Sequence, residues 1–549
     1  MAFTRRTPGV FIKELTAFPP SVVGIQTAVP VFIGYTEKAD ISGKPVPLTP
    51  VRITSLADYE EVFGGEFDPI YTLTPVTVLA EQEAQQFDFK VFQPDPPTQA
   101  GWKYFNLVRK TDDPTVPRFN LYNSMRLFYD NGGGDCYVVS VALYKTLDGT
   151  SFNPVSGEAL LEGLKAAGEQ VGPTMIVIPE AVLLPKTDSN APVFQSAEFQ
   201  QVAQAMLDQC FTLKDRVAIL DLYGTQFIGD PALTTPVTLD DVVGQFRIDV
   251  DVPNEQLNYG MAYFPFLHTS VVPSSDFDFT NITPTDAPDP TPGLKQILLW
   301  ENTNLYGTSP RAAAVKDKID AAMVTPPPTD VIKLNQDLAA ALPLLGDMQK
   351  IMATKTDRLP PSGAMAGVFT YVDKTRGVWN APANISLKSV KSTTLNLNNA
   401  QQEDLNVPVD GKAIDAIREF VGRGPVVWGA RTLDGNSNDY RYIQVRRTLI
   451  YIEQSIKAAL NRFVFAPNDG NTWVTVTSLI SNFLQDLWSS GGLMGAKASD
   501  AFTVQCGLGS TMTGLDILNG YMIVQVTLQM IRPAEFIELT FKQRMEGVA

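Results

Sequence analysis

The fold is decided by three short apolar runs, YVVSVA (137–142), MIVI (175–178) and VAILD (217–221). Two stretches with helical periodicity, 158–167 and 198–211, separate them. Strand, helix and strand alternate here with the spacing of βαβ units, whose right-handed crossovers place successive strands parallel. The sequence therefore predicts a mixed α/β fold with a mostly parallel sheet in this block.

The residues before this block are predicted to be largely extended. Val29–Tyr35 is typical of a buried strand, and Pro30 places it at a strand start or on a sheet edge. Residues 66–118 are rich in Pro, Thr, Asp and Gln, which favours an insertion or a long loop. A helix is expected over Leu121–Tyr129, ended by the glycines of Asn131–Asp135.

After the block the pattern weakens and then recovers. Residues 228–295 revert to a composition rich in Pro, Asp and Thr, and no firm element is predicted there. Leu334–Leu342 is predicted to be a helix. An amphipathic helix is predicted over Tyr442–Phe463, because apolar residues recur there at three- and four-residue steps. Asn438 or Asp439 is placed to cap its start.

One more helix and two strands are predicted near the C-terminal end. The helix is Thr472–Trp488, with Asn471 as its N-cap and Gly491–Gly492 as its stop. Apolar and polar residues alternate over Met522–Met530, which predicts a half-buried strand. Ile537–Phe541 alternate in the same way and predict a second strand.

The composition excludes several classes of site. The 549 residues contain one histidine, His268, so a single chain cannot build a zinc site with two histidines. Cys136, Cys210 and Cys506 are too widely spaced for a disulfide framework, and we expect buried thiols in a reducing compartment. No signal peptide is recognised, and no apolar run approaches the ~20 residues that span a membrane. We therefore expect synthesis in the cytoplasm and no direct membrane insertion.

The net charge of −16 is unevenly distributed. Residues 1–359 carry 26 basic and 43 acidic side chains, whereas residues 360–549 carry 17 and 16. This acidity argues against broad nucleic-acid binding. It serves as a solubilising surface, which is the commoner use of net charge, or it indicates that two parts of the chain face different neighbours.

No group of residues predicts catalysis, a metal site or a cofactor. The glycines of Asn131–Asp135 end a helix and precede a strand, which reverses the order of a phosphate-binding loop. Gly507–Gly514 lacks the Gly-Lys-Ser/Thr ending of a P-loop and is expected to be a flexible connection. His268 lies among aromatic residues, which is typical of a packed or loop histidine.

Five basic residues belong to the helix predicted over 442–463 or lie directly before it: Arg441, Arg446, Arg447, Lys457 and Arg462. A solvated helix face is the commoner explanation for such a group, and a partner-binding face is the sharper one. Nucleic acid is a weak third explanation, because the surrounding chain is acidic and offers no stacking platform.

Both ends of the chain carry extended, partly apolar segments outside the compact blocks. A terminal strand either frays or completes a sheet, and that sheet can belong to a neighbouring subunit. Main-chain hydrogen bonds gained in this way contribute roughly 0.5–1.5 kcal/mol each.

A set of short motifs follows in order along nearly the whole chain. They are TPGVFIKE (7–14), GIQTA (24–28), FIGYT (32–36), ITSLADYEEVFG (53–64), NGGGDCYVV (131–139), PPSGAMAG (360–367), GVWNAPAN (377–384), GRGPVVWGART (422–432), RRTLIYIE (446–453), FAPN (465–468) and RPAEF (532–536). Each motif is weak alone, but their order is specific and resembles the tail sheath proteins of contractile phage tails and contractile injection systems. Residues 66–118 and 228–355 match least, as expected of variable, outward-facing insertions.

The resemblance implies a multidomain chain with a core built from the N-terminal segment and the C-terminal region, inserted outer domains that include the βαβ block, and extended terminal arms. The expected divisions are 1–36 (N-terminal arm and first core strand), 37–118 (variable outer region), 119–227 (βαβ-containing domain), 228–355 (variable outer insertion), 356–530 (C-terminal core domain) and 531–549 (C-terminal arm).

The resemblance also implies a structural function without catalysis or cofactor. Sheath subunits polymerise around an inner tube and contract from a metastable extended state, which drives the tube through a target envelope. The implied partners are further copies of the chain, the inner tube protein, and baseplate and tail terminator proteins, with no nucleic acid. The final particle would be a virion, an extracellular injector or a membrane-anchored system.

The resemblance assigns roles to three groups of residues. N-terminal arm residues expected to contact neighbouring subunits are Pro8, Gly9, Val10, Phe11 and Ile12. C-terminal arm residues with the same role are Arg532, Pro533, Phe536, Ile537, Leu539 and Phe541. Candidates for facing the tube are the basic residues Arg441, Arg446, Arg447, Lys457 and Arg462.

Two alternatives stay open. A sheath-like terminator or baseplate adaptor of the same fold should lack one arm or the late motifs. An α/β enzyme that uses the βαβ block would need a phosphate loop or paired catalytic groups after a strand.

Overall fold

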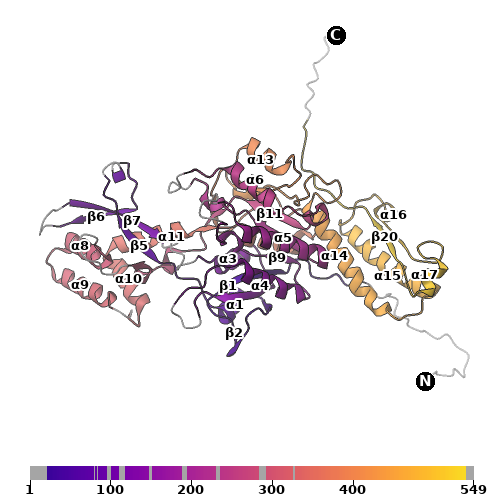
Figure 1. Ribbon diagram of the computed structural model, residues 1–549, viewed down its shortest axis with the longest axis horizontal. Coiled ribbons are helices and arrows are strands. Elements are labelled where there is room, and N and C mark those ends of the chain that lie inside the picture. Colours follow the sequence, from indigo (N-terminus) through magenta and orange to yellow (C-terminus); the bar gives the residue numbers. More distant parts are fainter. Residues whose placement is uncertain are drawn as a thin grey trace, which may run out of the picture. The chain divides into compact units, whose positions relative to one another are not determined.

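The chain folds into two compact units (Figure 1). The sheet unit comprises Thr27–Arg376 and Ala381–Arg446, and the C-terminal unit comprises Met1–Gln26, Gly377–Asn380 and Arg447–Ala549. The computed structural model describes residues 22–78, 81–82, 84–94, 101–109, 118–146, 151–187, 194–229, 235–283, 292–324 and 328–539.

The sheet unit is built on a nine-stranded sheet. In order across the sheet, the strands are β15 (Ile385–Ser386), β18 (Gly424–Val427), β17 (Asp415–Phe420), β11 (Gly260–Phe264), β10 (Val217–Asp221), β9 (Met175–Val177), β1 (Pro30–Thr36), β8 (Cys136–Leu143) and β4 (Val51–Ile53). The six strands from β17 to β8 run parallel, and the remaining three join by antiparallel pairing. The predicted α/β class and mostly parallel sheet are confirmed.

Strand β1 lies in the interior of this sheet, with all seven residues buried. It pairs in parallel with β8 on one side and β9 on the other. Pro30 is its first residue, so a strand start is the right explanation for this proline and a sheet edge is the wrong one. A proline at the first position of a strand costs little, because the N–H group that it lacks would lie at the very end of the hydrogen-bond ladder.

Strand β11 corrects the sequence prediction that residues 228–295 contain no firm element. Gly260–Phe264 is fully buried and pairs with β10 and β17. Its run GMAYF is only five residues long and is bounded by Gly260 and Pro265, so the local signal is short and the flanking strands β10 and β17 stabilise it. Strands β1, β9, β11 and β17 come from four of the expected domains, so those divisions do not follow the sheet.

Helices pack along the sheet as amphipathic elements. Helices α3 (Leu121–Asp130), α4 (Gly157–Glu169), α5 (Ala197–Leu213) and α12 (Ser362–Arg376) pack on its strands, and α6 (Leu239–Asp249) packs on α5. The helices predicted over 121–129, 158–167 and 198–211 are confirmed. Shorter elements of this unit are α1 (Leu56–Phe63), α7 (Asn254–Leu257), α13 (Asn399–Asn406), the hairpin of β2 (Asp40–Ile41) and β3 (Lys44–Pro45), and the small sheet of β14 (Arg358–Leu359), β12 (Leu267–Thr269) and β16 (Val390–Thr393).

Two glycines allow α3 and α12 to approach each other closely. A Cβ atom added at Gly363 would lie 2.6 Å from the carbonyl oxygen of Ser124. A Cβ atom at Gly367 would lie 2.5 Å from the carbonyl oxygen of Phe128. Any larger residue would force the two backbones apart, so the spacing of these helices depends on glycine.

Buried carboxylates hold helix N-termini at the carboxyl ends of the parallel strands. Glu180, which follows β9, accepts hydrogen bonds from the backbone N–H groups of Leu121 (2.8 Å) and Asn120 (3.2 Å) at the start of α3. Asp221, which ends β10, accepts the backbone N–H (2.9 Å) and the hydroxyl (2.5 Å) of Ser362 at the start of α12. Burial raises the pKa of Glu180 to about 8 and that of Asp221 to about 7.

Two regions far apart in sequence form one inserted subdomain (Figure 1). Its sheet runs β13 (Ile282–Thr283), β5 (Tyr71–Pro75), β7 (Gly101–Arg109), β6 (Phe89–Gln93). Its helices are α8 (Leu294–Tyr306), α9 (Pro310–Ala322), α10 (Val331–Ala341) and α11 (Pro343–Thr356). A long loop over 66–118 is therefore wrong, because three strands form there. The helix predicted over 334–342 is confirmed as α10.

The C-terminal unit packs two helices against a two-stranded sheet. Helix α14 (Ile443–Leu460) begins in the sheet unit and continues into this one, and α15 (Gly470–Ser489) follows. The N-cap of α15 is Asp469, whose carboxylate accepts the N–H of Thr472 (3.0 Å), and not the predicted Asn471. The remaining elements are α16 (Ala498–Ala501), β19 (Phe502–Gln505), α17 (Gly514–Leu518) and β20 (Gln525–Leu528).

We predict that Gly367→Ala destabilises the sheet unit by about 1–3 kcal/mol, because its methyl group would press on the backbone of α3. Urea unfolding followed by circular dichroism measures the change. Gly346→Ala is the matched control, because Gly346 lies inside α11 with open space around its Cβ position. The control should stabilise the chain by about 0.5–1 kcal/mol. Equal effects of the two substitutions would contradict the close-packing argument.

We predict that Glu180→Gln removes part of the pH dependence of stability. The folded-state pKa is raised to about 8, so this group's contribution is fully present below its ordinary pKa of 4.5 and is lost as pH rises through about 8. The wild-type protein should therefore lose on the order of 3 kcal/mol between pH 5 and pH 8.5 that the variant retains. Urea unfolding at several pH values tests this, with the exposed Glu158→Gln as control. Parallel profiles for wild type and Glu180→Gln would refute it.

Candidate assembly surfaces

The sheet of β19 and β20 contains two strands, and Met530, just after β20, forms one isolated antiparallel bridge with Leu493. The two strands pair antiparallel from Phe502–Leu528 to Gln505–Gln525. Side chains alternate, so that Phe502 and Val526 pack against the helical core of this unit and Thr503 is exposed. Within the described residues no third strand joins this sheet. A two-stranded sheet is marginal alone, and exposed strand edges are the usual place for strand addition.

The core that packs beneath this sheet combines a residue from the N-terminal part of the chain with residues from the C-terminal part. Val22 packs with residues of α14 and α15, among them Ile452, Leu479 and Leu484. The backbone N–H of Ile25 donates to the hydroxyl of Ser455 (3.2 Å). The segment that follows the N-terminal arm is therefore anchored in the C-terminal unit, which agrees with the expectation that the N-terminal segment joins the C-terminal region.

The predicted arm residues fall partly inside and partly outside the described residues. Pro8, Gly9, Val10, Phe11 and Ile12, with Phe541, lie outside the described residues. Arg532 is exposed, and Pro533 is half-buried. Phe536, Ile537 and Leu539 are 76%, 77% and 73% exposed and lie in no strand. The strand predicted over 537–541 is thus not formed over its described residues 537–539, because no strand of the described chain pairs with them.

Sequence periodicity missed an apolar surface on two loops of the C-terminal unit. Phe465 is fully exposed and has a φ of +67°, which is strained for an aromatic residue. The loop continues to Asn468, whose side-chain amide donates to the carbonyl oxygen of Tyr521 (2.9 Å) and so ties it to the second loop. Further exposed apolar residues on these loops and α17 are Val464, Leu515, Leu518, Tyr521 and Ile523, and Val474 is exposed on the first turns of α15. The motif FAPN (465–468) was the one sequence signal for this surface.

The group of five basic residues does not form one solvated face. Arg446 and Arg447 are 5% and 4% exposed. The Arg446 guanidinium stacks 4.0 Å from the ring centre of Tyr259 and donates to its hydroxyl (2.6 Å). Arg446 and Arg447 are buried within this chain, so neither a solvated helix face nor a partner-binding face explains these two arginines. Lys457 and Arg462 are exposed, and Arg441 is half-buried.

The other predicted features behave as packing elements. His268 Nδ1 lies 2.8 Å from Asp357 Oδ1, and Lys391 lies 3.3 Å from the other carboxylate oxygen. The glycines after α3 form a turn in which Gly133 donates to Phe128, and Gly132 has a φ of +101°. Cys136 and Cys210 are buried as expected, whereas Cys506 is half-buried.

The helix N-termini that would bind an anion in an α/β enzyme meet carboxylates of this chain. The order of strands reverses between β1 and β9, and ligands of open α/β sheets bind at such a point. Glu180 lies there and accepts the amides of α3. Among the described residues no group of three or more His, Cys, Asp or Glu is arranged to hold a metal ion. Of the helices in the described ranges, none has the length and apolarity to cross a bilayer.

Comparisons with known proteins agree on one family. Residues 436–544 match the phage tail sheath C-terminal domain. The tail sheath protein of Burkholderia phage BcepMu is 29% identical over 152 residues, which are 27% of this chain and 32% of the relative. That of Vibrio phage KVP40 is 26% identical over 138 residues, 25% of this chain and 20% of the relative. The aligned part thus spans about a third and a fifth of these two relatives.

Solved structures extend the similarity to the whole chain. The sheath complex of the extracellular contractile injection system PVC, in its contracted state, matches with a TM-score of 0.54 and 24% identity over 99% of both chains. The contracted helical sheath of the anti-feeding prophage (AFP) matches with a TM-score of 0.54 and 24% identity over 98% of this chain and 100% of that one. The resemblance to contractile tail sheath proteins is therefore confirmed: residues 436–544 match the phage tail sheath C-terminal domain, and the chain as a whole has a fold similar to that of the PVC and AFP sheath subunits.

Proposed function

We propose that this protein is the structural subunit of a contractile sheath. Copies of the chain polymerise around an inner tube in an extended, metastable state and relax to a contracted state that drives the tube forward. The observation that carries the proposal is the two-stranded sheet of β19 and β20, which no third strand of the described residues joins, in a chain whose apolar residues Phe536, Ile537 and Leu539 are exposed. The fold match and the C-terminal domain match support it.

The arms link neighbouring copies by completing this sheet. Each strand added to β19 or β20 gains several main-chain hydrogen bonds, at roughly 0.5–1.5 kcal/mol each. The apolar side chains of Phe536, Ile537 and Leu539 leave water in the process, which contributes roughly 25 cal/mol per Å² of buried surface. Because the arms are covalent parts of their own subunits, such links can persist while the subunits rotate and slide during contraction.

The work of contraction comes from contacts between subunits, without catalysis or a cofactor. Bistable interfaces carry transitions of this kind, and a kinetic barrier holds the extended state. The inner tube, the baseplate and the tail terminator are the other partners of this proposal. Lys457, Arg462 and Arg441 remain the candidates for facing the tube. The acidic first two thirds of the chain, including the inserted subdomain, face outward.

Assembly takes place in the cytoplasm, and the particle is a phage tail or a contractile injection system. A terminator or baseplate adaptor of the same fold would form a single ring instead of a long tube. Electron microscopy of the purified protein separates the two functions, because a sheath subunit yields hollow striated tubes.

We predict that deleting residues 1–14 abolishes linked tubes without unfolding the protein. The described core of the C-terminal unit begins at Val22, so its packing should survive the deletion. Circular dichroism should be unchanged while electron microscopy finds no tubes. Deletion of residues 1–4 is the control, because it keeps the apolar arm residues Val10–Ile12. Normal tubes from the longer truncation would refute the arm model.

We predict that assembly protects the thiol of Cys506. This residue directly follows β19 and is half-buried, so a strand that pairs with the edge of β19 would run beside it and reduce its access to solvent. Cys136 and Cys210 are buried, and burial raises the pKa of Cys136 to about 12, so a maleimide should label Cys506 selectively.

The labelling rate of Cys506, followed by mass spectrometry, should fall when monomers assemble. Cys506→Ser serves as the control and should take up no label in either state. Equal labelling rates in monomer and tube would count against strand addition at β19.

A further inference from the structure

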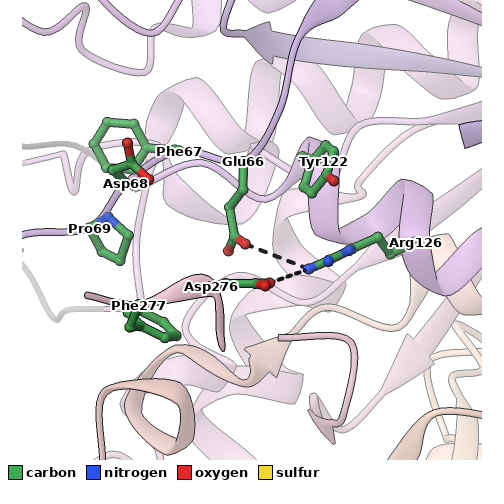
Figure 2. A pocket seen from close by; sticks show the side chains of 8 residues that line it. All are labelled: Glu66, Phe67, Asp68, Pro69, Tyr122, Arg126, Asp276 and Phe277. Carbon is green, nitrogen blue, oxygen red and sulfur yellow. Dashed lines mark hydrogen bonds and ion pairs between the residues drawn. The ribbon is translucent and has the colours of Figure 1, made fainter. Parts of the chain in front are cut away.

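Figure 2 shows a small pocket where the inserted subdomain joins the nine-stranded sheet. Arg126 of α3 points between two carboxylates from different segments. Its Nη1 atom lies 2.8 Å from Asp276 Oδ2 and 3.6 Å from Glu66 Oε2. Glu66 lies on the segment that enters the inserted subdomain before β5, and Asp276 lies on the segment between β12 and β13. We call Glu66, Arg126 and Asp276 the junction clamp.

A single stretch of α3 holds both segments. Asn123 Nδ2 donates to Glu66 Oε1 (2.6 Å), and Arg126 Nη1 also donates to the carbonyl oxygen of Val271 (2.6 Å). The Arg126 guanidinium stacks 5.2 Å from the ring centre of Tyr122. Helix α3, which packs on the sheet, therefore contributes the cationic side of the clamp, and the connecting segments contribute the carboxylates.

The inserted subdomain holds the same two segments from its own side. Asn281 Nδ2 donates to the carbonyl oxygen of Pro69 (3.0 Å), and Gln349 Nε2 of α11 donates to that of Phe277 (2.9 Å). Short, hydrogen-bonded connections thus link the junction clamp to α11 and β5. The pocket at this place has a volume of about 160 Å³.

Glu66 changes its charge near neutral pH. Burial raises its pKa to about 7, and the neighbouring Asp276 raises it further, while Asn123, Arg126 and Arg109 lower it. The titratable and charged groups that face Glu66 come from five elements or segments: Arg126 and Tyr122 on α3, Asp276 before β13, Arg109 at the end of β7, Tyr71 on β5, and Tyr144 after β8. Arg126 attracts the ionised form, but this attraction does not cancel the effect of burial.

We propose that the junction clamp is a proton-operated latch that sets how tightly the inserted subdomain is held against the sheet. When protonated, Glu66 is a neutral group that accepts the hydrogen bond of Asn123, with 17% of its side chain exposed. When ionised, it places a second negative charge beside Asp276, and the two carboxylates then share the single guanidinium of Arg126. Because the folded-state pKa of Glu66 lies above its ordinary value, the contribution of Glu66 to holding the inserted subdomain is strongest in acid and is lost as pH rises through about 7.

Hydrogen–deuterium exchange of the full-length protein tests the latch. Protection of peptides over 64–71 and 270–281, corrected for intrinsic exchange, should fall about 30-fold from pH 5.5 to pH 8.5 if opening solvates Glu66 fully, as a pKa change from 4.5 to about 7 requires. Peptides from β10 serve as the internal reference. Glu66→Gln should keep the junction protected across this range, whereas the exposed Glu61→Gln should follow the wild-type protein.

A second variant keeps the test decisive if Glu66→Gln does not fold. Asp276→Asn removes the like charge that raises the pKa of Glu66, so the midpoint of junction opening should move to lower pH. An unchanged midpoint in this variant, or a wild-type junction whose protection is independent of pH, would overturn the proposal. The experiment uses the chain alone, so its outcome is independent of whether the protein forms a sheath.

Discussion

The main-chain pairing of β1 with β8 and β9 is the constraint on which the rest of the sheet unit depends. Strand β1 is buried along its whole length and forms parallel ladders on both sides. Removing it would divide the sheet into the β8–β4 pair and the strands from β9 to β15. Because β1 comes from the beginning of the chain, the later βαβ units must assemble around it. The point between β1 and β9 where the strand order reverses follows from this arrangement.

Buried carboxylates then fix the helices to the sheet. Glu180 and Asp221 lie at the ends of neighbouring strands and bind the N-termini of α3 and α12, two helices that touch through Gly363 and Gly367. Each carboxylate satisfies amides that would otherwise lack partners in the helix. The same positions bind phosphate groups in many α/β proteins, so this chain has an open α/β topology but fills its anion positions with its own side chains. As a consequence of this arrangement, Glu180 and Asp221 are buried acids whose protonation state changes near neutral pH.

The two units differ in how completely they bury their apolar side chains within the single chain. The sheet unit covers both sides of its sheet within one chain, whereas the C-terminal unit leaves a two-stranded sheet and exposed apolar loops. Side chains such as Phe465 and Leu518 remain in water in the single chain, although the core beneath β19 and β20 is well packed. Under the proposed function this incompleteness is what drives subunits to associate.

The sequence by itself determined the elements whose burial follows a regular period. The strands of residues 137–221, the helices α14 and α15 and the half-buried strand around β20 could be read from apolar spacing, because that spacing reports which side of an element is buried. Motif order identified the family. The tertiary structure alone decided which segments meet. The strand β11, the single subdomain formed by 66–118 and 276–356, and the burial of Arg446 under Tyr259 all depend on partners distant in the chain. Local periodicity records that a residue is buried, but it carries no information about what covers it, and for Arg446 that partner is 187 residues away.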